Sequence, residues 1–513
     1  GHWLICSPNW LHSGSQPGYR RLPCFGSLSS VQPLCRPLIL EPEHSSPKLR
    51  QPELCAASCR LLRSTDLRTG PVPASTQMAA WSGTEEAISA FQQLLRLRTI
   101  SEEGPSGAYH EAVDFLTSFA TDVGFTSECC RVVEPVEGHP VLLVTWEGTE
   151  PHLPKIMLNS HYDVVPVAPD QWDVDPFGGV EAESGKIYGR GAQDMKSVCI
   201  QYLAAIRRLR EAGFSPRRTV ILSFMPDEEV GGANGMLKFL ESEAWKELQP
   251  VGMALDEGIA NPGDEYTVFF GERAVWQVEV VATGPTGHGS RFIPGPATSK
   301  LIAMCNKALA YREAQEAELG HSGGCSHANA KKLGDVTTVN ITVLKAGHTT
   351  DGGKTYTYNS VPAEAMAMFD VRIATTTPIA EFGALMDEWC SQEGVSWRLA
   401  PPRPPMYEHY VTSTDREKNP WWGLFSDAVA AAGVPVQAEV FPAATDCRFL
   451  RQAGLPAFGF SPMRRTQVLM HDHNEYLHRD VFLEGIAVYE LLVTALAGAE
   501  RLPTEEVAAA AEG

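Results

Sequence analysis

The chain has 513 residues, 43% of them hydrophobic and 20% charged, which is the composition of a globular protein large enough for two domains. Its formal net charge of −20 excludes nucleic acid as an expected partner, because a phosphate backbone binds to a basic surface. No uninterrupted apolar run approaches the roughly 20 residues of a membrane span, so no membrane partner is expected either. The 12 cysteines lie at irregular intervals without a CxxC pair, which predicts reduced thiols and a cytoplasmic location.

Residues 1–77 differ in composition from the rest of the chain. They carry 8 basic and 4 acidic residues, whereas the remainder has 34 basic and 58 acidic residues. They also hold ten prolines and show no sustained apolar periodicity, a composition that does not favour a packed core. The first methionine is Met78. We therefore expect residues 1–77 to be translated upstream sequence, with a targeting presequence as the alternative.

The next part of the chain predicts alternating helices and strands. Apolar residues at helical spacing indicate helices that begin near residue 84 and span 109–123, and apolar runs indicate strands over 141–146, 155–160 and 219–225. Between the last two strands, residues 194–213 have the pattern of a helix. A strand, a long helix and a further strand form a right-handed crossover. Residues 78–271 are thus expected to be an α/β sandwich with ligands at the carboxyl edge of its sheet.

The pattern changes after about residue 272. Strands are predicted over 275–281, 336–344 and 363–373 and near Trp397, and helices over 296–319 and 379–392. Strand-helix-strand-strand-helix-strand is the order of a ferredoxin-like α+β unit. The α/β pattern then resumes with a helix over 421–433 and strands near 440 and over 455–460, so residues 272–400 are predicted to be an insertion and 401–513 to complete the first domain. Residues 320–334 and 347–358 are expected to be long loops.

Imidazoles and carboxylates follow the predicted strands or open the predicted helix. They are His161, Asp163, Asp194, Asp227, Glu228, Glu229, Asp256, Glu257 and His471. Zinc accepts imidazole nitrogen and carboxylate oxygen, and a pair of ions needs one carboxylate that bridges them. Asp194 is the expected bridge, because the N-terminus of a helix favours a carboxylate. His161 would then hold one ion and His471 the other, each with a terminal carboxylate of its own.

The adjacent acids Glu228 and Glu229 are expected to divide the work. Neighbours on an extended backbone point in opposite directions, so one can bind metal while the other serves as general base. Taken singly, His161 could be a hydrogen-bonded core histidine and Asp194 a helix N-cap. The joint placement of all these groups at one edge of one sheet instead favours a two-zinc amide hydrolase.

From about Thr84 to Leu496 the chain resembles the M20 family of zinc peptidases and amidohydrolases. The motifs that carry this resemblance are LNSHYDVVPV, YGRGAQDMKSVCIQYL, PDEEVGG, ALDEGIANP, GHGSRF, NPWW, PAATDCRFLR, GFSPM and LMHDHNEYLH. The resemblance implies a zinc-peptidase-like α/β sandwich catalytic domain with an inserted ferredoxin-like dimerisation (lid) domain. It also implies hydrolysis of N-acyl-L-amino acids, especially N-acetylated neutral or aliphatic ones, by two zinc ions per subunit. The alternatives are a dipeptidase of the same family and an inactive metal-binding homologue.

The resemblance also assigns roles to single residues. It implies one zinc held by His161 and Glu257, the other by Glu229 and His471, and Asp194 as the bridge. Asp256 stays an alternative to Glu257, and His473 to His471, although the family pattern of a histidine followed four residues later by glutamate selects His471 and Glu475. Two further roles concern residues beside the metals: Asp163 would orient His161, and Glu228 would be the catalytic base.

The inserted domain gains a function from the same resemblance. His288 in GPTGHGSRF matches a lid histidine that reaches the active site of the partner subunit and polarises the scissile carbonyl, which implies a homodimer through the lid. Asn359 in YNSVP and Arg372 in MFDVRI match positions that contact the substrate. A guanidinium can bind a substrate carboxylate through two parallel hydrogen bonds, and Arg448 is the second candidate for that contact.

The sequence departs from the family pattern at three places. Residues 347–358 are longer than the expected hairpin, Cys447 stands where asparagine is expected, and Tyr162 where threonine is usual. None of these changes removes a predicted metal ligand. Catalysis is therefore expected to survive, while the substrate preference could shift.

Overall fold

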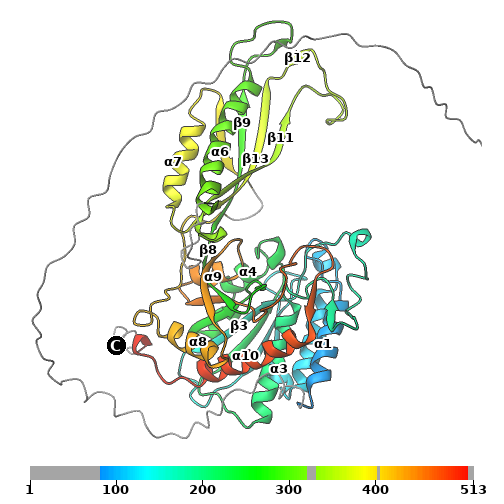
Figure 1. The fold of residues 1–513 in the computed structure, drawn as a ribbon, viewed down its shortest axis with the longest axis vertical. Helices are drawn as coiled ribbons and strands as arrows, with labels where there is room; N and C mark the ends of the chain where they lie inside the picture. The colour runs from blue at the N-terminus through cyan, green and yellow to red at the C-terminus, as the bar shows by residue number, and fades with distance from the viewer. Residues whose placement is uncertain (1–80, 321–330, 401–404, 506–513) are drawn as a thin grey trace, which may run out of the picture. The chain divides into compact units, whose positions relative to one another are not determined.

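A computed structural model describes residues 81–320, 331–400 and 405–505 (Figure 1). The predictions for residues 1–77, and most of the predicted loop over 320–334, lie outside the described residues. Among the described residues, no helix combines the length and the apolar character that crossing a membrane requires. The domain boundaries given above stay predictions.

Strands from both sides of the inserted segment form one eight-stranded mixed sheet. Its strands, in spatial order, are β1 (Cys130–Val133), β2 (Val141–Trp146), β6 (Val220–Met225), β3 (Lys155–His161), β7 (Val251–Asp256), β16 (Ala457–Phe460), β8 (Tyr266–Glu272) and β15 (Val436–Phe441). Strand β3 pairs in parallel with β6 and β7, and β7 pairs in parallel with β16. The carboxyl ends of these four strands therefore meet at one edge, as the sequence predicts.

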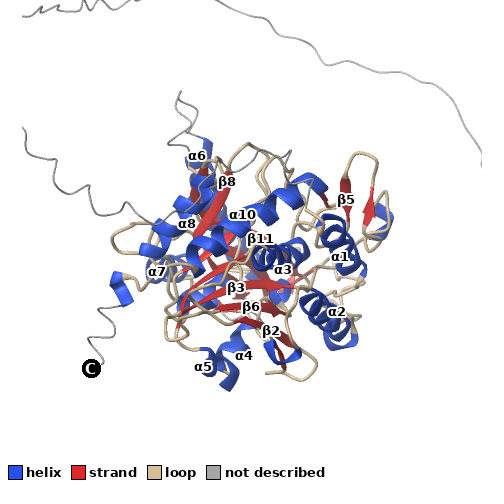
Figure 2. Ribbon diagram, turned by 90° about the horizontal axis from the view of Figure 1, so that it is seen from below, coloured by secondary structure: helices blue, strands red, loops and turns tan. Residues whose placement is uncertain are grey.

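Helices cover both faces of this sheet (Figure 2). On one face lie α1 (Thr84–Arg96), α2 (Tyr109–Asp122), α3 (Lys196–Glu211), α8 (Pro420–Ala431) and α10 (Arg479–Ala497), and on the other α4 (Met236–Glu241), α5 (Glu243–Leu248) and α9 (Cys447–Gln452). Along β3, Ile156 and Leu158 pack into the first core and Met157 into the second, since successive side chains of a strand alternate between faces. Burial on both faces explains why the parallel strands are continuous apolar runs.

The first helices and strands agree with the predicted pattern, with one correction at α3. This helix begins at Lys196, not at Asp194, and its N-cap Met195 makes no side-chain capping bond. Asp194 therefore lies in the preceding loop. The argument from the helix dipole is wrong for this residue, and contacts with histidines hold its carboxylate instead, as described below.

The inserted segment forms a separate four-stranded antiparallel sheet. Its strands, in spatial order, are β11 (Thr338–Ala346), β13 (Glu364–Ile373), β9 (Ala274–Thr283) and β14 (Val395–Leu399). Helices α6 (Ala297–Gly320) and α7 (Ile379–Trp389) share one apolar core with this sheet, and Figure 1 shows them side by side. Burial alternates along β13, because only one face is covered. The order of elements and strands confirms the predicted ferredoxin-like unit.

Two small sheets complete the described fold. Strands β10 (Gly287–His288) and β12 (Ser360–Val361) pair within the inserted segment, and β17 (Tyr476–His478), β5 (Lys186–Tyr188) and β4 (Val180–Glu181) form a three-stranded sheet. Between β11 and β12, the backbone N–H of Thr357 donates to the His348 carbonyl (2.9 Å) and closes the predicted long loop. The cysteines among the described residues are all free thiols.

Candidate metal centre and active site

The shared edge of β6, β3 and β7 carries the predicted chemical groups. His161 is the last residue of β3, Glu228 and Glu229 follow β6 by a few residues, and Glu257 follows β7 directly. Because the three strands are parallel neighbours, side chains distant in sequence arrive at one place. His161, Glu228 and Glu257 are buried. Glu229 is half-buried as a whole residue, but its side chain is almost fully enclosed.

His161, Asp194 and Glu257 form the first group of possible metal ligands. The ligand atoms that they offer all lie within 4.8 Å of one another. His161 Nε2 is 3.1 Å from Asp194 Oδ1 and 3.5 Å from Glu257 Oε2. One imidazole nitrogen therefore faces two carboxylate oxygens across a space suited to a single cation.

Asp194, Glu229 and His471 form the second group. His471 Nε2 lies 2.9 Å from Glu229 Oε2 and 3.3 Å from Asp194 Oδ2. Asp194 thus presents Oδ1 to the first group and Oδ2 to the second. This is the arrangement that a bridging carboxylate requires.

The site holds more acidic groups than its histidines can balance. Burial, together with the nearby Asp194 carboxylate, raises the pKa of Glu229 to about 7 and that of Glu257 well above its ordinary value. Hydrogen bonds to Asp194 and Glu229 raise the pKa of His471 to about 10. Crowded buried carboxylates with two imidazoles are a donor set that divalent cations neutralise, and the nitrogen and oxygen ligands suit zinc.

Asp163 connects the two sides of this centre. Its Oδ1 and Oδ2 accept the backbone N–H groups of Glu228 (3.2 Å) and Glu229 (3.1 Å), and Oδ1 is 3.4 Å from His161 Nδ1. The Asp163 carbonyl is also 3.1 Å from that nitrogen. With Nδ1–H donating to Asp163, the Nε2 atom of His161 is left free to bind metal.

Glu228 belongs to neither group of ligands, although it is only 8% exposed. Burial and the neighbouring Asp446 and Glu229 raise its pKa well above the ordinary value, against the opposing effect of His161 and Arg448. A buried carboxyl group with a raised pKa is suited to general base catalysis.

The backbone at Glu228 and Glu229 is a 3₁₀ turn over Glu228–Val230, so the expectation of an extended segment there is wrong. The turn follows Asp227, whose φ of 63° lies in the left-handed region. Three side chains hold Asp227 in place: Tyr109 Oη donates to Oδ1 (2.9 Å), Asn234 Nδ2 donates to Oδ2 (3.1 Å), and His139 Nε2 lies 3.2 Å from Oδ2. The turn, and not strand alternation, separates the two glutamates.

The inserted unit brings His288 and Asn359 together. The pairing of β10 with β12 places His288 opposite Ser360, and the Gly289 N–H donates to the Asn359 carbonyl (2.7 Å). His288 Nε2 lies 3.5 Å from Asn359 Nδ2, and its Nδ1 lies 3.2 Å from the Ser290 backbone nitrogen and 2.8 Å from the Ser290 hydroxyl. These contacts hold the ring beside Asn359.

Both arginine candidates already have partners among the described residues. Arg372 on β13 donates to both oxygens of Asp370 (2.7 and 3.2 Å). Arg448 on α9 donates to the Gly231 carbonyl (2.7 Å), and its guanidinium lies 4.5 Å from the centre of the Phe449 ring. Binding of a substrate carboxylate by Arg372 would thus compete with Asp370.

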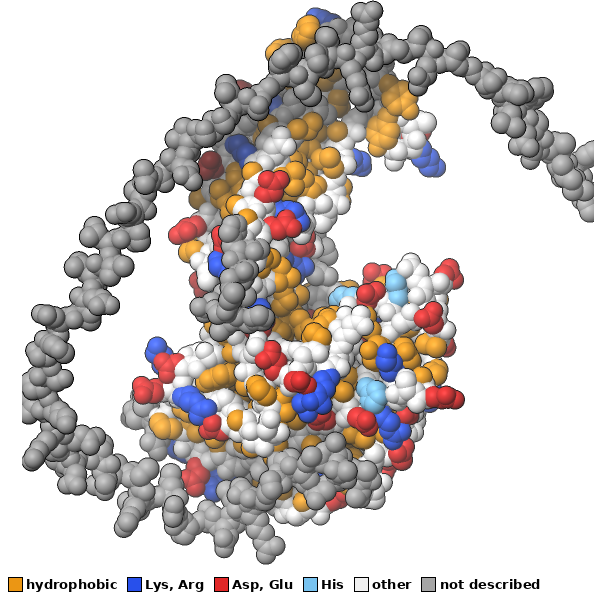
Figure 3. Space-filling view, in the orientation of Figure 1, with side chains coloured by type: hydrophobic (Ala, Val, Ile, Leu, Met, Phe, Trp, Pro, Cys, Tyr) orange, Lys and Arg blue, Asp and Glu red, His pale blue; other side chains and the backbone are white. Residues whose placement is uncertain are grey.

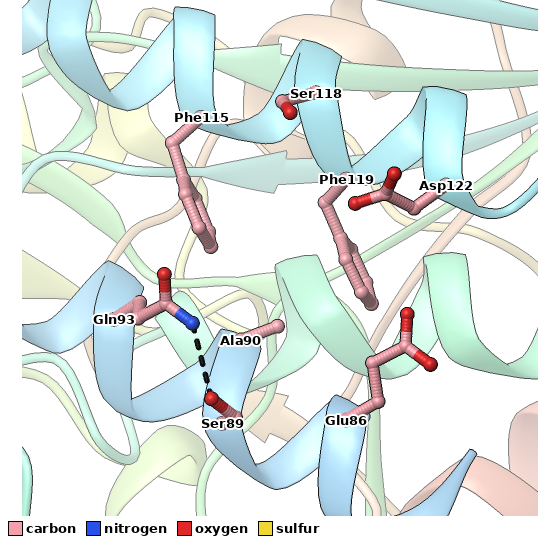
Figure 4. Close-up of a pocket in the computed structure, with 8 residues that line it drawn as sticks. All are labelled: Glu86, Ser89, Ala90, Gln93, Phe115, Ser118, Phe119 and Asp122. Atoms are coloured by element: carbon pink, nitrogen blue, oxygen red, sulfur yellow. Dashed lines mark hydrogen bonds between the residues drawn. The ribbon is translucent and has the colours of Figure 1, made fainter.

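A pocket between α1 and α2 is separate from these groups (Figure 4). Phe115 and Phe119 line it, and Glu86 and Asp122 lie at its rim. None of the residues predicted for catalysis or metal binding lines it. The pocket is therefore separate from the predicted active site.

Comparison with known proteins identifies the family. The sequence model of peptidase family M20/M25/M40 matches residues 157–495. Aminoacylase-1 of Dictyostelium discoideum is 43% identical over 416 residues, which cover 81% of this chain and 98% of that protein. Aminoacylase-1 of Homo sapiens is 43% identical over 426 residues, covering 82% of this chain and 99% of the relative.

The chain belongs to the M20 family.

Solved structures show the same fold. The M20 metallo-carboxypeptidase Sso-CP2 of Sulfolobus solfataricus superposes with a TM-score of 0.60 at 17% identity, covering 80% of this chain and 99% of that one. The di-peptidase Dug1p of Saccharomyces cerevisiae gives a TM-score of 0.61 at 14% identity, covering 83% and 98%. These likenesses support the M20 α/β architecture.

Among the alternatives left open by the sequence, the structure places Glu257 and His471 in the two groups of possible metal ligands. Asp256 instead accepts a hydrogen bond from Asn159 (2.9 Å), and His473 belongs to neither group. Ligand and catalytic roles stay predictions for all these residues. Sequence reasoning missed the anchors of Asp227 altogether, and it noted Glu475 only for its spacing from His471.

Proposed function

We propose that this M20 protein hydrolyses N-acyl-L-amino acids, preferentially N-acetylated neutral or aliphatic ones, to a free L-amino acid and a carboxylate, with two zinc ions per subunit. The observation that carries the proposal is the pair of ligand groups that share Asp194, with Glu228 beside them and outside both. Full-length similarity to aminoacylase-1 proteins supports the substrate class.

Each residue has a defined task in this proposal. His161 and Glu257 would hold one zinc, Glu229 and His471 the other, and Asp194 both. Bound zinc would supply Lewis acidity to the scissile carbonyl and to the attacking water.

Glu228 takes the proton of that water and transfers it to the nitrogen of the leaving amine, so that the amide C–N bond breaks as the new C–O bond forms. Asp163 keeps the Glu228–Glu229 turn and the His161 ring in place through the contacts described above.

The lid contributes the remaining groups. His288 would donate a hydrogen bond to the carbonyl oxygen of a substrate bound in the partner subunit. Asn359 and Arg372 would contact the rest of the substrate. The homodimer that this requires would form through the lid sheet, whose edge strand β11 exposes Val343 and Leu344 (39% and 63%).

Charge and thiol state agree with a cytoplasmic enzyme of small substrates. On the face seen in Figure 3, basic side chains of the described residues lie singly or in small groups among acidic ones. The free thiols of the described residues are typical of a reducing compartment.

The test is zinc-dependent release of methionine from N-acetyl-L-methionine by the full chain. We expect activity that is lost on chelation and regained with zinc. Unblocked dipeptides serve as the comparison substrates, because a dipeptidase would prefer them. Faster hydrolysis of dipeptides, or no hydrolysis of either substrate with both metal positions filled, would overturn the proposal in favour of the dipeptidase or of the inactive homologue.

A further inference from the structure

One buried carboxylate joins the two loops that carry Asp194 and His471. Glu475 is completely buried, and four donors surround its side chain. Oε1 accepts the backbone N–H groups of Gln193 (2.6 Å) and Asp194 (3.4 Å), and Oε2 accepts from Arg190 Nη1 (2.6 Å) and from the Gly191 N–H (3.1 Å). The loop that carries Asp194 is thus hydrogen-bonded to the side chain of Glu475, which lies four residues after His471 in the sequence.

Gln193 makes the reciprocal connection. Its Nε2 donates to the carbonyls of Gln467 and Tyr476 (2.9 Å each), and its Oε1 accepts the Leu469 N–H (2.9 Å). These partners lie on both sides of His471 in sequence. One side chain from each loop is therefore bonded to the backbone of the other, which fixes the distance between them.

The second metal group depends on this connection more than the first. His471 has a φ of 62°, and its side chain is 53% exposed, so little packing restrains it. His161 and Glu257, by contrast, are 1% and 3% exposed and lie at the ends of neighbouring strands.

We propose that Glu475 and Gln193 are positioning residues that hold Asp194 and His471 at metal-binding separation, and that they set the affinity of the position formed by Asp194, Glu229 and His471. This inference rests on the proposed two-zinc function. Neither residue offers a ligand atom to the groups described above. Asp194 and His471 both belong to the second group, whereas only Asp194 belongs to the first, so loss of either positioning residue should weaken the second metal position more than the first.

A matched control comes from another buried acid. Glu272 is 2% exposed, accepts from Arg451 Nη1 (2.8 Å) and from the backbone N–H and hydroxyl of Thr445 (2.9 Å each), and belongs to neither metal group. Glu272→Gln and Glu475→Gln both leave a buried arginine without its carboxylate. Only the second change touches the loops of Asp194 and His471.

The experiment titrates zinc into metal-free full chain against a competing chelator, with thermal unfolding of each metal-free variant measured in parallel. Wild type should bind two zinc ions. In Glu475→Gln the affinity of the second position should fall by about 10-fold to 100-fold, which is typical of residues that orient metal ligands, and that of the first position, which shares only Asp194, should fall less. Glu272→Gln should lower the melting temperature while both ions bind as in wild type.

Gln193→Ala removes the reciprocal bonds without exposing a buried charge, and it should show the same larger loss at the second position if Glu475→Gln does not fold. Two zinc ions bound with unchanged affinities in the tested variant would overturn the inference, as would equal weakening of both positions. If wild type itself binds fewer than two ions, the proposed function fails, and the positioning role fails with it.

Discussion

Asp163→Asn should weaken the contacts that connect the metal centre to the turn that carries Glu228. The carboxylate accepts the N–H groups of Glu228 and Glu229 and also contacts His161 Nδ1. A carboxamide keeps one acceptor oxygen and adds an NH₂ group. In every orientation of the substituted side chain that NH₂ would face at least one of these donors, so at least one contact is lost and replaced by repulsion.

The size of the effect follows from the number and type of bonds. A hydrogen bond to a charged group contributes about 1.5–3 kcal/mol, so the free energy of unfolding should fall by about 2 kcal/mol for the one contact that must be lost. Loss of a residue that orients a metal-bound histidine lowers metal affinity about 10-fold to 100-fold, or about 1.4–2.8 kcal/mol. The affinity loss should fall on the position that contains His161.

The assay combines zinc titration, urea unfolding of the metal-free chain and steady-state hydrolysis of N-acetyl-L-methionine. Asp256→Asn is the matched control, because Asp256 is 1% exposed, lies at the end of the neighbouring strand and accepts a hydrogen bond from Asn159. If Asp163→Asn binds both zinc ions as tightly as Asp256→Asn does, Asp163 does not orient His161 and the reasoning fails.

Two further predictions concern stability. Contacts with Asp194 and Glu229 raise the pKa of His471 to about 10, and burial raises that of Glu229 to about 7. Both folded-state pKa values exceed the unfolded ones. In the metal-free protein, the stabilisation from Glu229 should be complete below about pH 4.5 and that from His471 below about pH 6.5. The first contribution should be lost as the pH rises through 7, and the second as it rises through 10. Thermal unfolding of metal-free wild type and His471→Asn between pH 7 and 10 checks this, and an equal slope in both would contradict it. Lys196→Met should lower the free energy of unfolding by about 1–3 kcal/mol, because the buried amino group, whose pKa burial lowers to about 7, donates to two carbonyls at the end of α1 (2.6 and 3.1 Å). Urea denaturation measures the change, and an unchanged midpoint would show that these bonds add no net stability.

The sequence predicts the sheet edge well because its signals are local. Buried parallel strands such as β3 and β6 are short apolar runs, and the polar residues that follow them must lie at their carboxyl ends. A helix between two such strands dictates the crossover and hence which ends lie together. The residues in the two metal groups were therefore accessible from pattern and from family resemblance.

Other features depend on contacts that no local pattern contains. Sequence patterns do not indicate helix α10. This helix packs against both α3 and α8, so its own apolar side chains are spread over more than one face and its amphipathic signal is weak. The 3₁₀ turn at Glu228 depends on Asp227, which Tyr109 holds from 118 residues away in sequence. The bond between Arg190 and Glu475 spans 285 residues.

Asp194 shows how a correct residue can be chosen for a wrong reason. Its carboxylate was expected to be held by a helix N-terminus, but α3 begins two residues later. Hydrogen bonds to His161 and His471 instead keep the pKa of Asp194 below its ordinary value despite burial, which by itself would raise it. The partners of a side chain, and not its place in an element, decide its electrostatic state here.

Glu228→Gln tests most directly whether this chain is a two-metal amidohydrolase with Glu228 as its base. The variant is nearly isosteric, and Glu228 offers no atom to either ligand group, so two zinc ions should still bind with wild-type affinities. With both positions filled, kcat for N-acetyl-L-methionine should fall by about 10²-fold to 10⁴-fold, the range typical of a lost general base, while KM changes little. Activity close to wild type in the zinc-loaded Glu228→Gln protein would contradict the assignment of the base.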